Sequence, residues 1–263
     1  MQKANLIIRG FLFKKGRVQG CNSDGWWKYN INFLYVMPGY LRLMDRLSKK
    51  YELSVYISSY DTTPSKMIEY LEEVLTIKKI IICPEQDSSQ FTTMHSALKE
   101  CSDDLTFIIR SDLIVKEKLS TAICDFNYSL DTIYAFAHEN SEGGIIDDNI
   151  IDVFHAVSGK KIDDLLKTPV DSHGRLLHQA AEMHHLHHSL DVEYILPHDE
   201  SGLPLVDHID TYKNDYWEIY RQAPYSYLYD YKDFDKNHKD SRPTDWDDVK
   251  QIFRNARIFD KFG

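Results

Sequence analysis

The stretch LTFIIRSDL, residues 105–113, contains the clearest structural signal in the chain. Residues 105–109 are mostly apolar, with β-branched and aromatic side chains, which is typical of a strand buried in the centre of an α/β sheet. Charged residues follow at once, with Arg110 and Asp112 one residue apart. Because open α/β sheets bind ligands outside the carboxyl ends of their strands, this pair predicts a site for a phosphate and its metal ion.

The composition is that of an ordinary globular protein. The chain has 263 residues, of which 43% are hydrophobic and 27% charged, enough for one large α/β domain with a full core. Its formal net charge of −10 argues against a nucleic-acid partner, because contact with a phosphate backbone needs a surplus of lysine and arginine. No internal repeat or low-complexity linker divides the chain, so we expect a single domain over residues 1–263.

The cysteines and the apolar runs indicate the compartment. Cys21, Cys83, Cys101 and Cys124 lie far apart and form no CxxC pair, which suggests neither a zinc ribbon nor a disulfide scaffold. The N-terminal apolar run is too short for the core of a signal peptide, and no later segment approaches the length of a membrane span. We therefore expect a soluble cytoplasmic protein.

Strand-like and helix-like segments alternate along the first two thirds of the chain. The predicted strands cover residues 6–13, 53–58, 79–83, 105–109, 132–137, 150–155 and 192–196. The predicted helices cover residues 35–50, 66–75, 92–101, 161–167 and 176–190. Strands that alternate with helices of this length indicate βαβ units, so we expect a Rossmann-like fold with a mainly parallel central sheet flanked by helices.

This order of elements, with the charged tip Arg110-Ser111-Asp112, resembles the nucleotide-binding half of a GT-A glycosyltransferase. In that family an Asp-x-Asp motif closes the strand that follows a helix with small residues, and its carboxylates hold Mn²⁺ or Mg²⁺ on the donor diphosphate. The Arg-Ser-Asp-Leu tip is similar to that of viral and algal GT-A-like enzymes in which arginine replaces the first acid. The resemblance spans about residues 5–196. It implies a donor-binding half over about residues 5–130 and an acceptor half over about residues 131–263.

The resemblance implies transfer of a sugar from a nucleoside diphosphate, most simply UDP, to an oligosaccharide or glycan acceptor. Negative charge accumulates on the departing diphosphate, and either a divalent cation held by Asp112 or the guanidinium of Arg110 would neutralise it. A surface ion pair or a helix cap is the structural alternative for these two residues. Tyrosines and tryptophans over residues 217–246 offer stacking faces for the acceptor, or pack as core.

Further candidates for the donor site follow the first two predicted strands. The resemblance places Asp61 where GT-A proteins hold the nucleotide base, although an aspartate just before a helix is equally typical of an N-cap. Arg9 and Gly10 end the first strand, where glycine permits close backbone contact with a nucleotide or simply forms a turn. Thr62 and His95 complete the predicted donor-binding set.

Direct displacement at the sugar needs a base that removes the proton of the acceptor hydroxyl. The polar segment 138–149 contains several acids, and we expect it to form a loop between two strands beside the donor site. Asp148 is the first candidate for the base and Asp147 the second, for an enzyme that inverts the anomeric carbon. A solvated acidic loop is the alternative, and a retaining mechanism would need neither residue.

The histidines suggest a different chemistry. Six of the twelve lie over residues 173–188, and on a helix His184 and His188 would share a face at i, i+4, which is compatible with a metal site. His155, at a strand end, is a separate candidate metal or phosphate ligand, or a core residue. A metal-dependent hydrolase is therefore an alternative function, and a non-catalytic nucleotide- or carbohydrate-binding protein is another. A solvated helical face is the structural alternative for the cluster, because no HExxH pattern is present.

Overall fold

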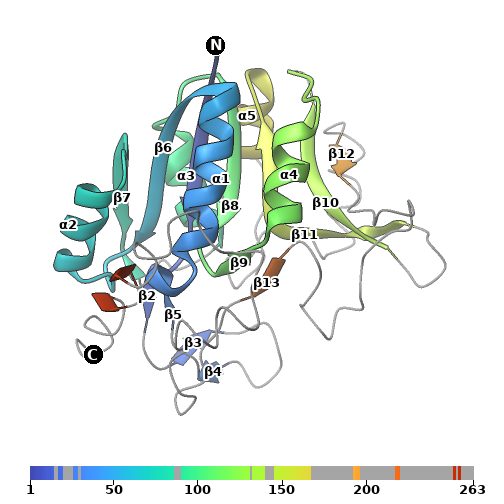
Figure 1. Cartoon of the computed structure of the whole chain (residues 1–263). Coiled ribbons are helices and arrows are strands. Elements are labelled where there is room, and N and C mark those ends of the chain that lie inside the picture. The colour runs from blue at the N-terminus through green and yellow to red at the C-terminus, as the bar shows by residue number, and fades with distance from the viewer. Residues whose placement is uncertain are drawn as a thin grey trace.

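A computed structural model of the protein describes residues 1–14, 17–19, 26–28, 31–85, 90–130, 132–139, 145–166, 192–195, 217–219, 251–252 and 254–255. The central strands are β1 (Gln2–Arg9), β6 (Tyr51–Tyr60), β7 (Lys79–Cys83), β8 (Leu105–Arg110), β10 (Ile133–Glu139), β11 (Ile145–Val157) and β12 (Val192–Ile195). They form one seven-stranded sheet in the order β12-β10-β11-β8-β1-β6-β7 (Figure 1). Only β11 runs antiparallel to its neighbours in this sheet, so the predicted mainly parallel sheet is confirmed.

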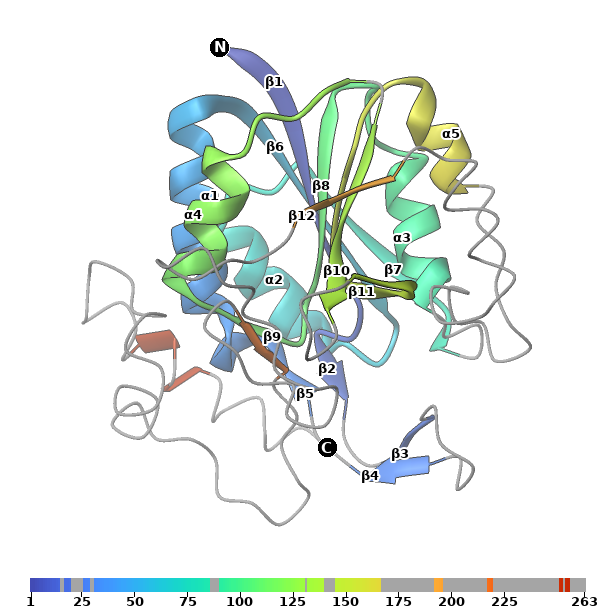
Figure 2. The ribbon, with the colours of Figure 1, turned by 90° about the vertical axis from the view of Figure 1, so that its right-hand side faces the viewer.

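Helices cover both faces of the sheet (Figure 2). One core lies between the sheet and three helices, α1 (Met37–Lys50), α2 (Ser65–Val74) and α4 (Glu117–Asp125). The other lies between the sheet and two helices, α3 (Gln90–Leu98) and α5 (Lys160–Leu166). No helix in the described part of the chain is both long and apolar enough to cross a membrane.

Short elements extend the carboxyl edge of the sheet. A 3-10 helix, η1 (Phe33–Tyr35), comes before α1. The two-stranded pairs are β2 (Phe13–Lys14) with β5 (Ile31–Asn32), β3 (Arg17–Gln19) with β4 (Trp26–Lys28), and β9 (Leu113–Val115) with β13 (Trp217–Ile219). The last pair ties a short stretch of the aromatic tail to the segment that follows β8.

Strand β1 lies inside the sheet, with β6 on one side and β8 on the other. Its residues Leu6, Ile7 and Ile8 are all fully buried, because helices cover both faces and the strand needs no polar side. Each such side chain contributes about 1.5–3 kcal/mol to folding through burial. This explains why a continuous apolar run, and not an alternating one, marks the strand.

The chain reverses its direction across the sheet at β1. It passes outward from β1 to β6 and β7, and then returns to β8 on the other side of β1. In open α/β sheets the crevice outside the carboxyl ends of the strands at such a reversal is the usual ligand site. Arg9 and Arg110 are the last residues of the two strands that border it.

Two predicted boundaries are wrong for identifiable reasons. The first strand ends at Arg9 and not at residue 13, because Gly10 adopts a φ of +114°, which an extended strand does not allow. The first helix begins at Met37 and not at residue 35. Pro38, which has no amide hydrogen to donate, occupies its opening turn.

The predicted loop over residues 138–149 is also partly wrong. Strand β10 continues to Glu139, and β11 already begins at Ile145, so Asp147 and Asp148 belong to a strand. The two strands form an antiparallel hairpin in which Glu139 pairs with Ile145, and this pairing satisfies backbone groups that a loop would leave to water. The predicted helix over residues 176–190 lies outside the described residues.

Candidate functional site

Two arginines end the strands on either side of the reversal. Arg9 and Arg110 are register partners in the parallel β1–β8 pair, so their Cα atoms are about 5 Å apart and their side chains leave the same face of the sheet. This is the face that carries α3, because Ile7 and Ile108, two residues earlier in each strand, belong to the core beneath that helix. Arg9 is only 2% exposed. The reversal therefore brings two guanidinium-bearing side chains to neighbouring strands.

The neighbour of Arg9 on its other side is Ser58 of β6. Ser58 is fully buried, and its Oγ has no hydrogen-bond partner among the described residues. Since Tyr56, two residues earlier, packs in the core beneath α3, the Ser58 side chain lies on the same face as the two arginines. One hydroxyl-bearing and two guanidinium-bearing residues thus occupy register-paired positions on three neighbouring strands.

Arg110 and Asp112 form a bidentate ion pair. The Nε of Arg110 donates to Oδ1 of Asp112 at 2.9 Å, and its Nη2 donates to Oδ2 at 2.6 Å. The Arg110 side chain is only 14% exposed and the Asp112 side chain only 10%. The pair is therefore largely buried, and the alternative interpretation as a surface ion pair is wrong. Paired, charge-assisted hydrogen bonds of this kind fix the plane of the guanidinium as well as its position.

The turn between β8 and β9 is fastened to the exit of β1. The amide of Ser111 donates to the carbonyl of Arg9 at 2.7 Å, and its hydroxyl donates to the carbonyl of Phe11 at 2.9 Å. Gly10 makes this contact possible, because a Cβ at that position would lie 2.9 Å from Ser111 Oγ. Gly10 was predicted to allow close approach of a nucleotide, and the close approach that the structure shows is that of Ser111.

Asp61 and Thr62 lie at the carboxyl end of β6. The Oδ1 of Asp61 accepts the backbone N–H of Glu85 at 3.0 Å, which joins the ends of β6 and β7. Asp61 does not cap α2, whose N-cap is Pro64, so the N-cap alternative is wrong. The hydroxyl of Thr62 donates to the carbonyl of Phe13 at 3.0 Å. Both residues therefore border the same edge as the two arginines, where their predicted role in binding the donor stays a prediction.

The two predicted histidines lie on different elements, one on a helix and one on a strand. His95 is the sixth residue of α3 and is half-buried; burial, and then the charge of Lys99, lower its pKa. His155 pairs with Ile108 of β8, so it lies two residues inward from Arg110 and is 2% exposed. Because β11 is antiparallel, the strand end near His155 points to the edge opposite the arginines. Their roles as ligands remain predictions.

The two candidate bases lie at the same edge of the sheet as Arg110. The amino end of β11 contains Asp147 and Asp148 and pairs with the carboxyl end of β10. Because β11 is antiparallel to both β10 and β8, these two strands run in the same direction. The β10–β11 hairpin therefore extends from the edge that also carries Arg110.

The described residues do not suit a dedicated Mn²⁺ or Mg²⁺ site. Such ions prefer about six oxygen ligands, often from more than one carboxylate. Asp112 is the single acid of the turn, and both of its oxygens are bound by Arg110. Among the described residues no group of three histidine, cysteine, aspartate or glutamate side chains is placed to hold a metal. Binding of Mn²⁺ or Mg²⁺, with Asp112 and His155 as candidate ligands, stays a prediction.

Sequence reasoning missed two residues that shape the site. Tyr40 of α1 reaches the turn that carries Asp112, and Ser111 fastens that turn to β1. Tyr40 follows the helical apolar spacing and looks like an ordinary core residue. A serine between two charged residues gives no sequence signal that its hydroxyl binds a carbonyl 100 residues away.

No family model matches the chain, and no curated protein is similar to it in sequence. Among solved structures, a nucleotidyl transferase from Methanothermobacter is similar over 91% of this chain and 97% of its own, with 11% identity and a TM-score of 0.49. Inositol-1-phosphate CTP transferase from T. maritima covers 74% of this chain and 84% of its own, with 11% identity and a TM-score of 0.43. The CMP:2-keto-3-deoxy-manno-octonic acid synthetase bound to CTP covers 73% and 88%, with 9% identity and a TM-score of 0.43. None of these three proteins is named as a glycosyltransferase.

Proposed function

We propose that the protein is a nucleotide-binding transferase that moves a sugar from a nucleoside diphosphate, UDP in the first instance, to a carbohydrate acceptor. The observation that supports this most is the Arg110–Asp112 pair, placed beside Arg9 at the reversal of strand order. A diphosphate carries negative charge that must be neutralised while the bond to the sugar breaks. Two guanidinium groups at one edge of the sheet are suited to that task.

We assign phosphate binding to one particular edge of the Arg110 guanidinium. Asp112 binds the edge of the guanidinium formed by Nε and Nη2. The edge formed by Nη1 and Nη2 has the spacing that matches two oxygens of a phosphate. In this proposal Asp112 keeps the guanidinium in place and Arg110 contacts the diphosphate, so the acid acts through the arginine and not through a cation.

The remaining groups are assigned by their place at the same edge. Asp61 and Thr62, at the end of β6, are proposed to contact the nucleoside. The base that deprotonates the acceptor is proposed to be Asp148, with Asp147 as the second candidate, because their hairpin extends from the carboxyl edge of the sheet. With an inverting displacement, the acceptor hydroxyl attacks opposite the departing diphosphate, which requires a base on the far side of the sugar.

Calorimetric titration tests the binding part of the proposal. Wild-type protein is titrated with UDP, with other nucleoside diphosphates and with the matching nucleosides. We expect Arg110→Ala to weaken diphosphate binding by about ten- to a hundredfold and to change nucleoside binding less than twofold, because a charge-assisted pair is lost while the nucleoside contacts remain. The matched control is Arg46→Ala, because Arg46 is also an ion-paired arginine but binds Glu117 on α4.

Turnover tests the reaction itself. A panel of nucleotide sugars is incubated with glycan acceptors, and release of nucleoside diphosphate is measured together with the glycosylated product. We expect Asp112→Asn to fold normally and to lose most of this turnover. Equal turnover by Asp112→Asn, or pyrophosphate release from a nucleoside triphosphate in place of sugar transfer, would contradict the proposal.

A further inference from the structure

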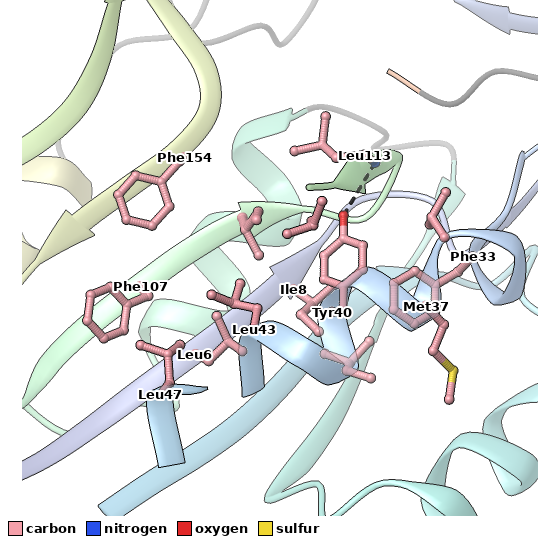
Figure 3. Close-up of a cluster of buried hydrophobic side chains, with 14 of the residues drawn as sticks. Leu6, Ile8, Phe33, Met37, Tyr40, Leu43, Leu47, Phe107, Leu113 and Phe154 are labelled. Atoms are coloured by element: carbon pink, nitrogen blue, oxygen red, sulfur yellow. Dashed lines mark hydrogen bonds between the residues drawn. The ribbon is translucent and has the colours of Figure 1, made fainter. Parts of the chain in front are cut away.

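Tyr40, the fourth residue of α1, touches both ends of the turn that carries Asp112. Its hydroxyl donates to the backbone carbonyl of Arg110 and accepts the backbone N–H of Leu113 at 3.3 Å. Figure 3 shows the ring projecting from α1, with the hydroxyl at its tip directed toward Leu113. One hydroxyl group thus connects the two ends of the turn to the helix, in a position that is fully buried.

The position of this hydroxyl is fixed by packing that does not involve the turn. The ring of Tyr40 packs edge-on against Phe33, with centroids 5.0 Å apart. Helix α1 is itself held close to β9, since the Nη2 of Arg42 donates to the carbonyl of Val115 at 2.9 Å. Arg42 also pairs with Glu117 of α4 at 3.0 Å. The helix therefore provides a fixed support against which the turn can be held.

The Tyr40 hydroxyl keeps its proton and so remains a hydrogen-bond donor. Burial, and in second place the negative charge of Asp112, raise the pKa of Tyr40 well above its ordinary value, so the phenol stays protonated and continues to donate to the carbonyl of Arg110. Ser111 fastens the middle of the same turn to the exit of β1. With the backbone of the turn held from both directions, the Arg110 and Asp112 side chains have one arrangement in which their bidentate pair forms.

We propose that Tyr40 is a positioning residue for the Arg110–Asp112 pair. Its hydroxyl holds the turn from Arg110 to Leu113 in the conformation in which Asp112 binds Arg110 through two hydrogen bonds and the guanidinium is presented to a diphosphate. The positioning of the Arg110–Asp112 pair by Tyr40 is a property of the protein without ligand. The consequence for the diphosphate rests on the function proposed above.

The first measurement needs no ligand. The Nε–H of Arg110 is identified in a ¹H–¹⁵N spectrum by its loss in Arg110→Lys, and its exchange with solvent is measured. We expect Tyr40→Phe to speed this exchange at least about tenfold, because the variant loses two hydrogen bonds and the loss of each changes a local equilibrium by up to about tenfold. The backbone amides of Ile7 and Ile108 should keep their protection, which shows that the sheet is intact.

The matched control is Tyr134→Phe. Tyr134 is 1% exposed, and its hydroxyl accepts the amide of Ser129 at 2.6 Å, near the start of β10 and so at the opposite edge of the sheet. This variant also loses a hydrogen bond of a buried tyrosine, but far from the turn, and should leave the exchange of Arg110 Nε–H unchanged. In wild-type protein, the Tyr40 hydroxyl proton should also exchange slowly and show a nuclear Overhauser effect to the amide proton of Leu113. That observation does not depend on the folding of any variant.

The second measurement is titration with UDP and with uridine. We expect Tyr40→Phe to weaken UDP binding about three- to tenfold and to leave uridine binding within twofold of wild type. In an Arg110→Ala background, Tyr40→Phe should have no further effect on UDP binding, because both changes act through the same guanidinium.

The outcomes separate the two proposals. Unchanged exchange of Arg110 Nε–H in Tyr40→Phe, or an exposed Tyr40 hydroxyl proton in wild type, overturns the positioning role. Equal loss of UDP and uridine binding, or additive effects in the Arg110→Ala background, also overturns it. If the exchange changes as expected but wild-type protein binds no nucleoside diphosphate, the positioning role stands and the proposed function fails.

Discussion

A methyl group added to Gly39 would collide with strand β9. The Cβ of an alanine at this position would lie 2.5 Å from the carbonyl oxygen of Val115 and 3.0 Å from the Val115 Cβ. Both neighbours belong to a fully buried residue, and the nearer one is a backbone atom that cannot rotate away. Helix α1 must therefore move away from β9 in Gly39→Ala. The same carbonyl accepts a hydrogen bond from Arg42, which the movement would lengthen.

The change in the free energy of unfolding caused by Gly39→Ala is the sum of two opposing contributions. Overpacking of a rigid contact costs about 1–3 kcal/mol, whereas alanine in place of glycine within a helix contributes about 0.5–1 kcal/mol of stability. We expect Gly39→Ala to lower the free energy of unfolding by about 1–2 kcal/mol. For a chain of this size that is a decrease in Tm of about 2–8 °C. Because Tyr40 moves with the helix, UDP binding should weaken as well.

Differential scanning calorimetry and urea unfolding measure the change. The matched control is Ser48→Ala on the exposed side of the same helix, which should stay within about 0.5 kcal/mol of wild type. An equal or higher Tm for Gly39→Ala would show that α1 and β9 are not in tight contact, and the reasoning for a fixed support beneath Tyr40 would then be wrong.

Three further predictions concern other parts of the chain. Asp148→Asn should keep UDP affinity and lower kcat at least about a hundredfold, whereas the same loss in Asp147→Asn and not in Asp148→Asn would make Asp147 the base. Retention of the anomeric configuration by NMR would remove both residues from the mechanism. Replacing His184 and His188 together by Gln should change neither turnover nor metal content, whereas loss of a stoichiometric zinc would favour the hydrolase. Burial, and then the charge of Glu100, raise the pKa of the Cys101 thiol from 9.0 to about 12, so across this interval the unfolded chain releases a proton that the folded chain keeps. The free energy of unfolding should therefore fall by about 1.4 kcal/mol per pH unit above pH 9 from this group, and urea titrations of Cys101→Ala should show a shallower decline.

Local patterns in the sequence are sufficient for the strands that approach the site. The predicted strand over residues 79–83 coincides with β7, and that over residues 105–109 differs from β8 by one residue. Short runs of β-branched residues bounded by turns carry this information within the strand itself. Arg9 and Arg110 could also be predicted as candidates one at a time, because each follows such a run.

The relations between distant residues could not be predicted in the same way. That Arg9 and Arg110 are register partners depends on the order of strands, which no local pattern contains. The direction of β11 depends on its pairing with β8 and β10. Because no local pattern contains this pairing, the sequence predicts a loop for the acids at the start of the strand. The contact of Tyr40 with Leu113 depends on where a whole helix packs. The chemistry of the candidate site was thus visible in residue types, and its geometry was not.

The central place of β1 also determines when the protein can fold on the ribosome. β1 is the first of the seven strands of this sheet to be synthesised, but one of its two partners, β8, begins about 100 residues later, at Leu105. At a synthesis rate of about 5–20 residues per second, the nascent chain exposes one edge of β1 for about 5–20 s. Over that time the segment from Leu6 to Ile8 is a ready binding site for chaperones that recognise extended apolar peptide. Stalled chains that end before β8 should therefore remain protease-sensitive, even though strands β1, β6 and β7 have already been made.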